Sequence, residues 1–178
     1  MIMKGKDMEQ KAVEEVAALM CAAARTAPKG KGVDNLVTLV VTGADKDKLA
    51  KEMRRVAEEH SVAFFARDAE NVDASAAVVI LGQRPVPFYL PVCGYCGFKD
   101  CADNIKHKGA CAISVGDLGI AACSAASVAG LHHIDNRIMF SCGRAALNLK
   151  LFKDASIKEA YGIPLSVTGK SPFFDRSK

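Results

Sequence analysis

The segment AAVVIL, residues 76–81, opens the stretch that decides the fold, and it leads through GQRPVPFYLPV (82–92) into CGYCGFKDC (93–101). The first segment is short, apolar and rich in β-branched side chains, which predicts a strand buried on both faces. Three prolines in the second segment predict an irregular connection, because proline fixes φ and lacks a backbone N–H. We therefore expect the chain to leave a core strand and enter a cysteine loop.

The cysteine loop carries a potential metal site. Its cysteines follow the spacing C-x2-C-x4-C-x9-C, at Cys93, Cys96, Cys101 and Cys111. Thiolates are soft ligands, which suit an iron–sulfur cluster or zinc better than a hard cation. Gly94 and Gly97 lack a Cβ, so the backbone can curl around a cluster and point N–H groups at its sulfurs. Structural zinc usually takes two C-x2-C pairs, and only one is present here. The spacing favours a [4Fe–4S] cluster, with zinc as the alternative occupant.

The whole chain has the composition of one globular domain. Its 178 residues are 50% hydrophobic and 25% charged, which is ordinary for a soluble protein with a real core. The net charge of +4 is modest and spread along the chain, and only 6% of the residues are aromatic. We therefore expect no nucleic-acid partner.

The sequence predicts neither a targeting segment nor a membrane span. Residues 1–7 are short and charged, and no apolar stretch of the signal-peptide type follows them. The longest weakly polar run, residues 119–131, is too short to cross a bilayer. We expect a cytoplasmic protein, in which the seven cysteines stay reduced rather than forming a disulfide framework.

Helices and strands alternate along the chain. Apolar residues at helical spacing predict helices over residues 7–25, 45–60, 117–131 and 136–152. β-branched and apolar runs predict strands over residues 36–42, 63–66, 76–81 and 160–168. The strand at 36–42 is expected to be buried on both faces, and Pro164 places the last strand at a sheet edge. This alternation indicates the α/β or α+β class.

The cysteine loop resembles the small iron–sulfur module of corrinoid iron–sulfur proteins and of membrane electron-transport complexes. That module reads C-G-x-C-G-x-x-x-C, followed by a more distant cysteine that binds the same [4Fe–4S] cluster. The resemblance implies that the cluster ligands are Cys93, Cys96, Cys101 and Cys111, although the last spacer is shorter here. The remaining cysteines sit among apolar helical neighbours and are expected to pack in the core; they are Cys21, Cys123 and Cys142.

A second resemblance covers most of the remaining chain. Residues 22–32 (AAARTAPKGKG) resemble the A-A-x-x-A-P-S-x-x-N segment of nitroreductase-like flavoproteins, which lies against FMN in that family. Residues 117–131 are similar to their central helix, and residues 161–176 to their closing strand and basic tail. The resemblance implies a three-layer core in which helices flank a mixed sheet, an FMN cofactor, and a homodimer formed by long helices.

In nitroreductases a basic R-x-S-x-R element binds the FMN phosphate. This element is missing here, since only Lys4 and Lys6 precede the first predicted helix. The cofactor-binding residues that the resemblance then implies are Arg25, Pro28, Lys29, Gly30, Lys31, Lys170 and Arg176. Backbone N–H groups of Gly30 and Gly32 can form an anion-binding nest. The alternative is that residues 28–32 form only a solvated turn.

Taken whole, the sequence is similar to a family of uncharacterised prokaryotic proteins described as containing a ferredoxin domain. The matching segments are residues 23–36, 117–129, 134–137 and 162–176. We expect a single nitroreductase-like domain over residues 1–178, with an inserted ferredoxin-like iron–sulfur loop at 83–115. Its [4Fe–4S] cluster would pass electrons to a flavin or to a redox partner protein, and an enzyme of this kind would be a flavin and iron–sulfur oxidoreductase. The alternatives are a cluster-only electron carrier or redox sensor, and a zinc-stabilised four-cysteine binding module without catalysis.

Overall fold

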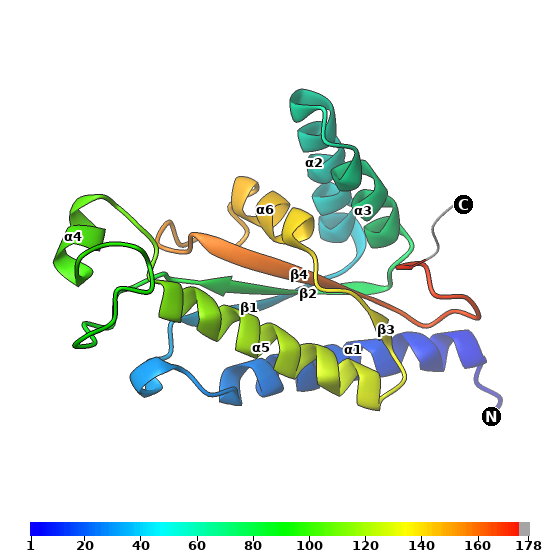
Figure 1. The fold of residues 1–178 in the computed structure, drawn as a ribbon. Coiled ribbons are helices and arrows are strands. Elements are labelled where there is room, and N and C mark those ends of the chain that lie inside the picture. The colour runs from blue at the N-terminus through cyan, green and yellow to red at the C-terminus, as the bar shows by residue number, and fades with distance from the viewer. Residues whose placement is uncertain (175–178) are drawn as a thin grey trace.

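Two helical layers enclose a sheet in this computed structural model, which describes residues 1–174 (Figure 1). One layer consists of α1 (Gly5–Thr26) and α5 (Ala112–Leu131). The other consists of α2 (Gly43–His60), α3 (Ala63–Asp73) and α6 (Phe140–Asn148). A 3₁₀ turn, η1 (Gly30–Gly32), follows α1, and the short helix α4 (Cys101–Lys106) lies in the cysteine loop. The three-layer arrangement confirms the predicted class.

The sheet contains four strands in the order β1-β2-β4-β3. Their bounds are β1 (Leu36–Val41), β2 (Ala77–Gln83), β3 (Asp135–Asn136) and β4 (Glu159–Ser166). Val79 at the centre of β2 pairs with Val40 on one side and with Ile163 on the other. Every strand pair in residues 1–174 is antiparallel, so the expectation of a mixed sheet is wrong.

The strand β2 is the centre of the core, and all seven of its residues are buried. Successive side chains of a strand point to opposite faces. Val79 and Leu81 therefore pack with α1 and α5, whereas Val78 and Ile80 pack with α2, α3 and α6. This confirms burial on both faces for β2. The same prediction is wrong for β1, which is an edge strand and leaves Val40 43% exposed.

Other predicted elements also differ. The helix predicted over 136–152 is the shorter α6, and Asn136 belongs to β3. Residues 63–66 are not a strand but the start of α3, because Phe65, Ala69 and Val72 recur at helical spacing and are buried. The last strand, β4, lies between β2 and β3 rather than at an edge. Pro164 is tolerated there because its nitrogen points to the same side as that of Gly162, away from β2, and β3 is only two residues long.

The helix α5 is longer than predicted, with 20 residues. Among residues 1–174 it is the one helix long and apolar enough, by length and composition, to cross a membrane, with a mean hydropathy of 1.5. The weakly polar run at 119–131 is only part of this helix, which begins at Ala112. In this fold α5 packs along α1 and on the sheet, with Leu118 and Ala121 in the shared core. Core helices of globular proteins have the same composition.

Candidate functional site

The cysteine segment leaves the end of β2 and returns to the start of α5, and it projects beyond the end of the sheet (Figure 1). Its base is closed by backbone contacts, because Cys111 N–H donates to the carbonyl of Pro85 (3.3 Å). Ser114 Oγ donates to the carbonyl of Arg84 (3.0 Å), and the Arg84 side chain pairs with Asp154 (2.7 Å). The two ends of the segment are therefore held together. That residues 83–115 form an inserted iron–sulfur module stays a prediction.

All four predicted ligands line one cavity of about 110 Å³; they are Cys93, Cys96, Cys101 and Cys111. All four are free thiols, the first three half-buried and Cys111 buried. Gly94 and Gly97 have φ of 68° and 80°, a left-handed conformation that favours glycine. Gly97 N–H donates to the carbonyl of Gly94 (2.9 Å), which turns the chain directly after Cys93 with Cys96 inside the turn. The fold thus brings the four thiols to the same place.

The four cysteine thiols line a shared cavity, and the kind of metal group it suits depends on their chemistry. Among residues 1–174, no three Cys, His, Asp or Glu side chains are grouped so as to hold a single metal ion. In a [4Fe–4S] cluster each of four thiolates binds a different iron, so the sulfurs stand apart around a cage. A zinc ion needs its four ligands to converge on one centre. Four soft thiolate donors around one cavity fit a [4Fe–4S] cluster, and the presence of only one C-x2-C pair leaves zinc as the alternative occupant.

Further residues shape the wall of this cavity. Phe98 is half-buried and stacks on His107, with 5.6 Å between the ring centroids. Asn104 is 1% exposed, and its Nδ2 donates to the carbonyl of Ala110 (3.0 Å), which fixes the approach to Cys111. Asp100 caps α4 by accepting the N–H of Asp103 (2.8 Å), so Cys101 begins that helix. Asn104 could not be predicted from the sequence, because an isolated asparagine belongs to no motif.

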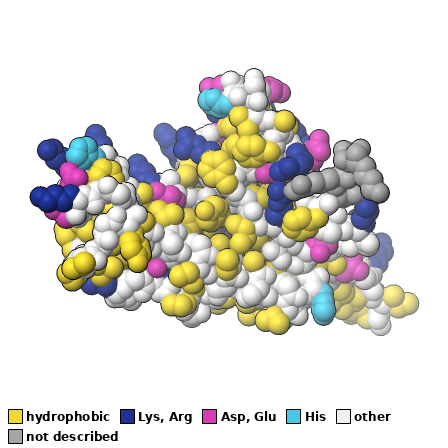
Figure 2. Space-filling view, viewed as in Figure 1, with side chains coloured by type: hydrophobic (Ala, Val, Ile, Leu, Met, Phe, Trp, Pro, Cys, Tyr) yellow, Lys and Arg dark blue, Asp and Glu magenta, His cyan; other side chains and the backbone are white. Residues whose placement is uncertain are grey.

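The outer surface of the segment is partly apolar. Figure 2 shows hydrophobic side chains at its tip and basic and histidine side chains over α4. Tyr89, Val92 and Tyr95 are 63%, 105% and 78% exposed. Lys106 and Lys108 are exposed nearby. The cavity of the cysteines therefore opens close to a surface with apolar and basic character.

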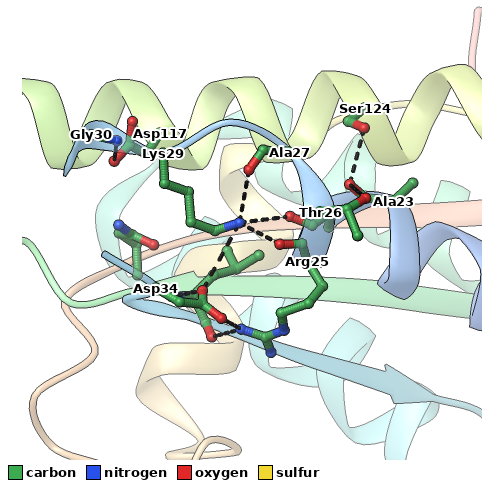
Figure 3. A network of polar contacts seen from close by, with 12 residues as sticks. Ala23, Arg25, Thr26, Ala27, Lys29, Gly30, Asp34, Asp117 and Ser124 are labelled. Atoms are coloured by element: carbon green, nitrogen blue, oxygen red, sulfur yellow. Dashed lines mark hydrogen bonds and ion pairs between the residues drawn. The ribbon is translucent and has the colours of Figure 1, made fainter. Parts of the chain in front are cut away.

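The predicted flavin loop is built around Lys29 (Figure 3). Its Nζ donates to the carbonyls of Ala24 (3.3 Å), Arg25 (2.6 Å) and Ala27 (3.0 Å). The side chain is 6% exposed, and Nζ lies 4.0 Å from Asp34 Oδ1. The last carbonyls of a helix lack partners within it and carry partial negative charge. Lys29 therefore caps the C-terminal end of α1.

Arg25 also binds within the chain. Its Nη1 donates to Asp34 Oδ2 (2.5 Å) and to the carbonyl of Leu36 (2.7 Å) (Figure 3). Partial burial is the largest single influence on the pKa of Asp34 and raises it, but the hydrogen bonds from Arg25 and the Leu36 N–H, together with the charges of Arg25 and Lys29, outweigh burial, so the pKa is lowered. Two of the cations predicted to hold FMN phosphate are thus already engaged with acceptors of the chain itself.

The rest of this loop lies against the cysteine segment. Gly30 N–H donates to Asp117 Oδ2 (3.0 Å) on α5, and Lys31 Nζ donates to the carbonyl of Phe88 (3.2 Å). A Cβ on Gly30 would lie 2.7 Å from the Phe88 ring and 3.1 Å from Ile113. Ile113 also lines the cysteine cavity. The two sites predicted separately are therefore neighbours. Asp117 gave one sequence signal, as the single charged residue of α5.

The other predicted flavin residues do not join this loop within one chain. Pro28 is exposed beside it. Lys170 lies on the arm that follows β4. The start of this arm, Val167 and Thr168, lines a pocket with Lys6 and Glu9 near the N-terminal end of α1, whereas η1 lies at the other end of that helix. The 22 residues of α1 span about 33 Å at 1.5 Å per residue. Arg176 lies outside the described residues.

The cysteines outside the loop have different environments. Cys142 is fully buried, and burial, with the charge of Asp68 adding, raises the pKa of its thiol. Cys21 is half-buried. Burial raises the pKa of its thiol, and a hydrogen bond with Thr38 lowers it by less, so the pKa is raised. Cys123 is exposed on α5, so the expectation that it packs in the core is wrong.

Comparison with known proteins gives a family and a fold. The model of a family described as "Uncharacterized protein containing a ferredoxin domain" matches residues 107–176, which include Cys111 but not the other three loop cysteines. An uncharacterized protein of Archaeoglobus fulgidus is 38% identical over 185 residues, covering 99% of this chain and 98% of the relative.

Solved structures with the same fold are nitroreductases. The FMN-dependent nitroreductase NfnB from Mycobacterium smegmatis, in complex with NADPH, matches with a TM-score of 0.59 and 16% identity over 88% of this chain and 78% of that chain. NfrA1 of B. megaterium matches with a TM-score of 0.56 and 12% identity over 93% of this chain. The present chain spans only 60% of the length of NfrA1. The fold is therefore nitroreductase-like, and the chain belongs to the family of uncharacterized proteins that contain a ferredoxin domain.

Proposed function

We propose that this protein is an iron–sulfur redox protein whose cluster ligands are Cys93, Cys96, Cys101 and Cys111. The observation that carries the proposal is that these four free thiols line one cavity. The description of the family as containing a ferredoxin domain supports it. A bound [4Fe–4S] cluster supplies one-electron transfer, at a potential set by hydrogen bonds to its sulfurs and by solvent exposure.

The residues of the loop have separate tasks in this proposal. The four thiolates would bind the irons of the cluster. The left-handed turns at Gly94 and Gly97 let the backbone follow the surface of a bulky group. Cys111 is the N-cap residue of α5, where the partial positive charge of the helix end favours an anionic ligand. Phe98 covers part of the cavity wall and limits the access of water.

We propose FMN as the electron acceptor within the core. NfnB, which has the same fold, is described as FMN-dependent. The contact of Gly30 and Lys31 with Phe88, and of Gly30 with Ile113, supports a flavin loop next to the cysteine cavity. One observation favours the second candidate, a cluster-only electron carrier: Lys29 and Arg25 already bind partners inside the chain. In that case electrons leave through a redox partner protein, and the exposed apolar and basic surface of the cysteine segment supports such docking.

We also propose a cytoplasmic homodimer. Along α5, exposed side chains recur every three or four residues without a charge, at Ile120, Cys123, Ser127 and Leu131. A Cβ on Gly116 or Gly119 would meet nothing within 4 Å, so another backbone can approach closely there. Light scattering of the wild-type protein should give twice the mass of one chain. The Ile120→Arg variant should be a monomer and give the mass of one chain. A monomeric wild-type protein would rule out the dimer.

Replacement of single cysteines tests the cluster ligands. Serine in place of Cys93, Cys96 or Cys101 should remove or destabilise the visible absorption of anaerobically purified protein. Cys21→Ser is the matched control, because Cys21 lies on α1 and lines no part of the cavity. Equal loss of absorption in the control would overturn the assignment. Release of a yellow chromophore on denaturation distinguishes the flavin candidate from the cluster-only one.

A further inference from the structure

A second cavity, of about 520 Å³, lies between the C-terminal end of α6 and the loop that leads to β4. It shares no lining residue with the cysteine cavity. Its volume falls within the range of about 300–1,000 Å³ that is typical of small-molecule sites. None of the residues predicted from the sequence to bind a metal or flavin lies in it.

The rim of this cavity is strongly basic. Four cations line it, at Arg144, Lys150, Lys153 and Lys158. Within residues 1–174 none of the four forms an ion pair or a side-chain hydrogen bond. Asp154 is the acidic residue of the lining, and its carboxylate is bound by Arg84 (2.7 Å) and by Ser156. The positive charge of the rim is therefore not balanced by the protein.

The loop holds two of these lysines in an uncommon conformation. Lys150 and Lys153 have φ of 55° and 53°, in the left-handed region. Lys150 stands just after the C-cap of α6, a position that usually carries glycine. A side chain there costs backbone strain. The chain nevertheless places an ammonium group at both positions.

Part of the lining is apolar and firmly packed. It consists of Leu147, Phe152 and Ile157. Phe152 and Ile157 lie over Gly82 of β2, where an added Cβ would come within 2.5 Å and 2.8 Å of them. This packing fixes an aromatic and aliphatic surface beside the cations. An aromatic ring can stack on such a surface.

We propose that this cavity binds a nucleotide with at least two phosphates. The base lies against Leu147 and Phe152, which are half-buried in the lining, and the phosphates lie among the four cations. Inorganic phosphate alone would contact only the cations of the rim. A nucleoside alone would contact only the apolar residues of the lining. The proposal goes beyond the redox function and does not depend on the cluster, since the two cavities are separate.

Calorimetric titration of the full protein with ADP tests this, with adenosine and pyrophosphate as separate probes. ADP is expected to bind one per chain, at least about tenfold more tightly than either fragment, a difference of about 1.4 kcal/mol. The affinity should fall as salt is added, because screening weakens exposed charge contacts. Absence of ADP binding would overturn the proposal. Pyrophosphate that binds as tightly as ADP would also overturn it, since the site would then be only a basic patch.

Paired variants locate the site. Lys150→Gln with Lys153→Gln should weaken ADP binding about tenfold. The control, Lys11→Gln with Lys51→Gln, changes the net charge equally at exposed positions on α1 and α2 and should leave the affinity unchanged. An equal loss in the control pair would contradict the assignment. Circular dichroism checks the fold of the loop variant, and Arg144→Gln, on the exposed surface of α6, replaces it if the loop unfolds.

Discussion

Replacement of Lys29 by methionine separates a structural from a cofactor-binding role for this residue. Methionine keeps most of the length and apolar surface of the side chain but removes the ammonium group. Three carbonyls at the end of α1 then lose their donor, those of Ala24, Arg25 and Ala27. Because the side chain is 6% exposed, water replaces the lost donor poorly. The variant should therefore be less stable even when no cofactor is bound.

The size of this effect follows from the contacts. A hydrogen bond to a charged group contributes about 1.5–3 kcal/mol, and three that share one ammonium group are not additive. Removing the ammonium also removes the cost of burying it. The expected net loss of unfolding free energy is about 2–3 kcal/mol. For a domain of this length that corresponds to a fall in Tm of about 5–10 °C.

Thermal and urea unfolding measure the loss. Lys31→Met is the matched control, since Lys31 is exposed and its Nζ makes one hydrogen bond, to Phe88. The control should lose less than about 1 kcal/mol. If Lys29→Met melts within about 1 °C of the wild-type protein, the capping role is refuted, and a role in cofactor binding becomes the better explanation.

Two further predictions concern the fold. Gly143→Ala on α6 should destabilise the protein by about 3 kcal/mol or more in urea unfolding, because the new Cβ would lie 1.9 Å from a backbone oxygen of β4. Gly169→Ala, at an exposed position where a Cβ meets nothing within 4 Å, should not destabilise it, and equal effects would contradict the close packing of α6 on β4. Hydrogen bonds from the hydroxyl and N–H of Ser156, with Arg84 adding, lower the pKa of Asp154 from 3.8 to about 2. A carboxylate whose pKa is lowered by folding stabilises the protein above its unfolded pKa. Asp154→Asn should therefore be less stable than the wild-type protein at pH 7, with the difference disappearing between about pH 4 and pH 2; a difference that does not change over this range would contradict the assigned contacts.

The sequence predicted the elements whose burial follows from their own residues. β2 begins with five apolar residues, 77–81, and lies inside the sheet, and α1 shows helical spacing from end to end. Tertiary contacts decided the elements that were predicted wrongly. Phe64 and Phe65 suggested a strand, but the segment packs on α2 as a helix. Pro164 suggested an edge, but the shortness of β3 leaves room for it inside the sheet.

The same distinction holds for the candidate site. The four loop cysteines could be predicted as ligands from the sequence, because their spacing alone is typical of a site for a soft metal. The partners of Lys29 depend on how the chain folds back at the end of α1. The contact of Gly30 with Asp117 joins residues 87 positions apart, which no local pattern reveals. The basic cavity likewise arises from the way the loop after α6 returns to the sheet.

The central claim is that four cysteines of the loop hold a [4Fe–4S] cluster. The most direct measurement is the iron, sulfide and zinc content of wild-type protein that has been purified and reconstituted without oxygen. The account predicts about four iron and four sulfide per chain. One zinc per chain with no iron or sulfide, after reconstitution has been attempted, would contradict it.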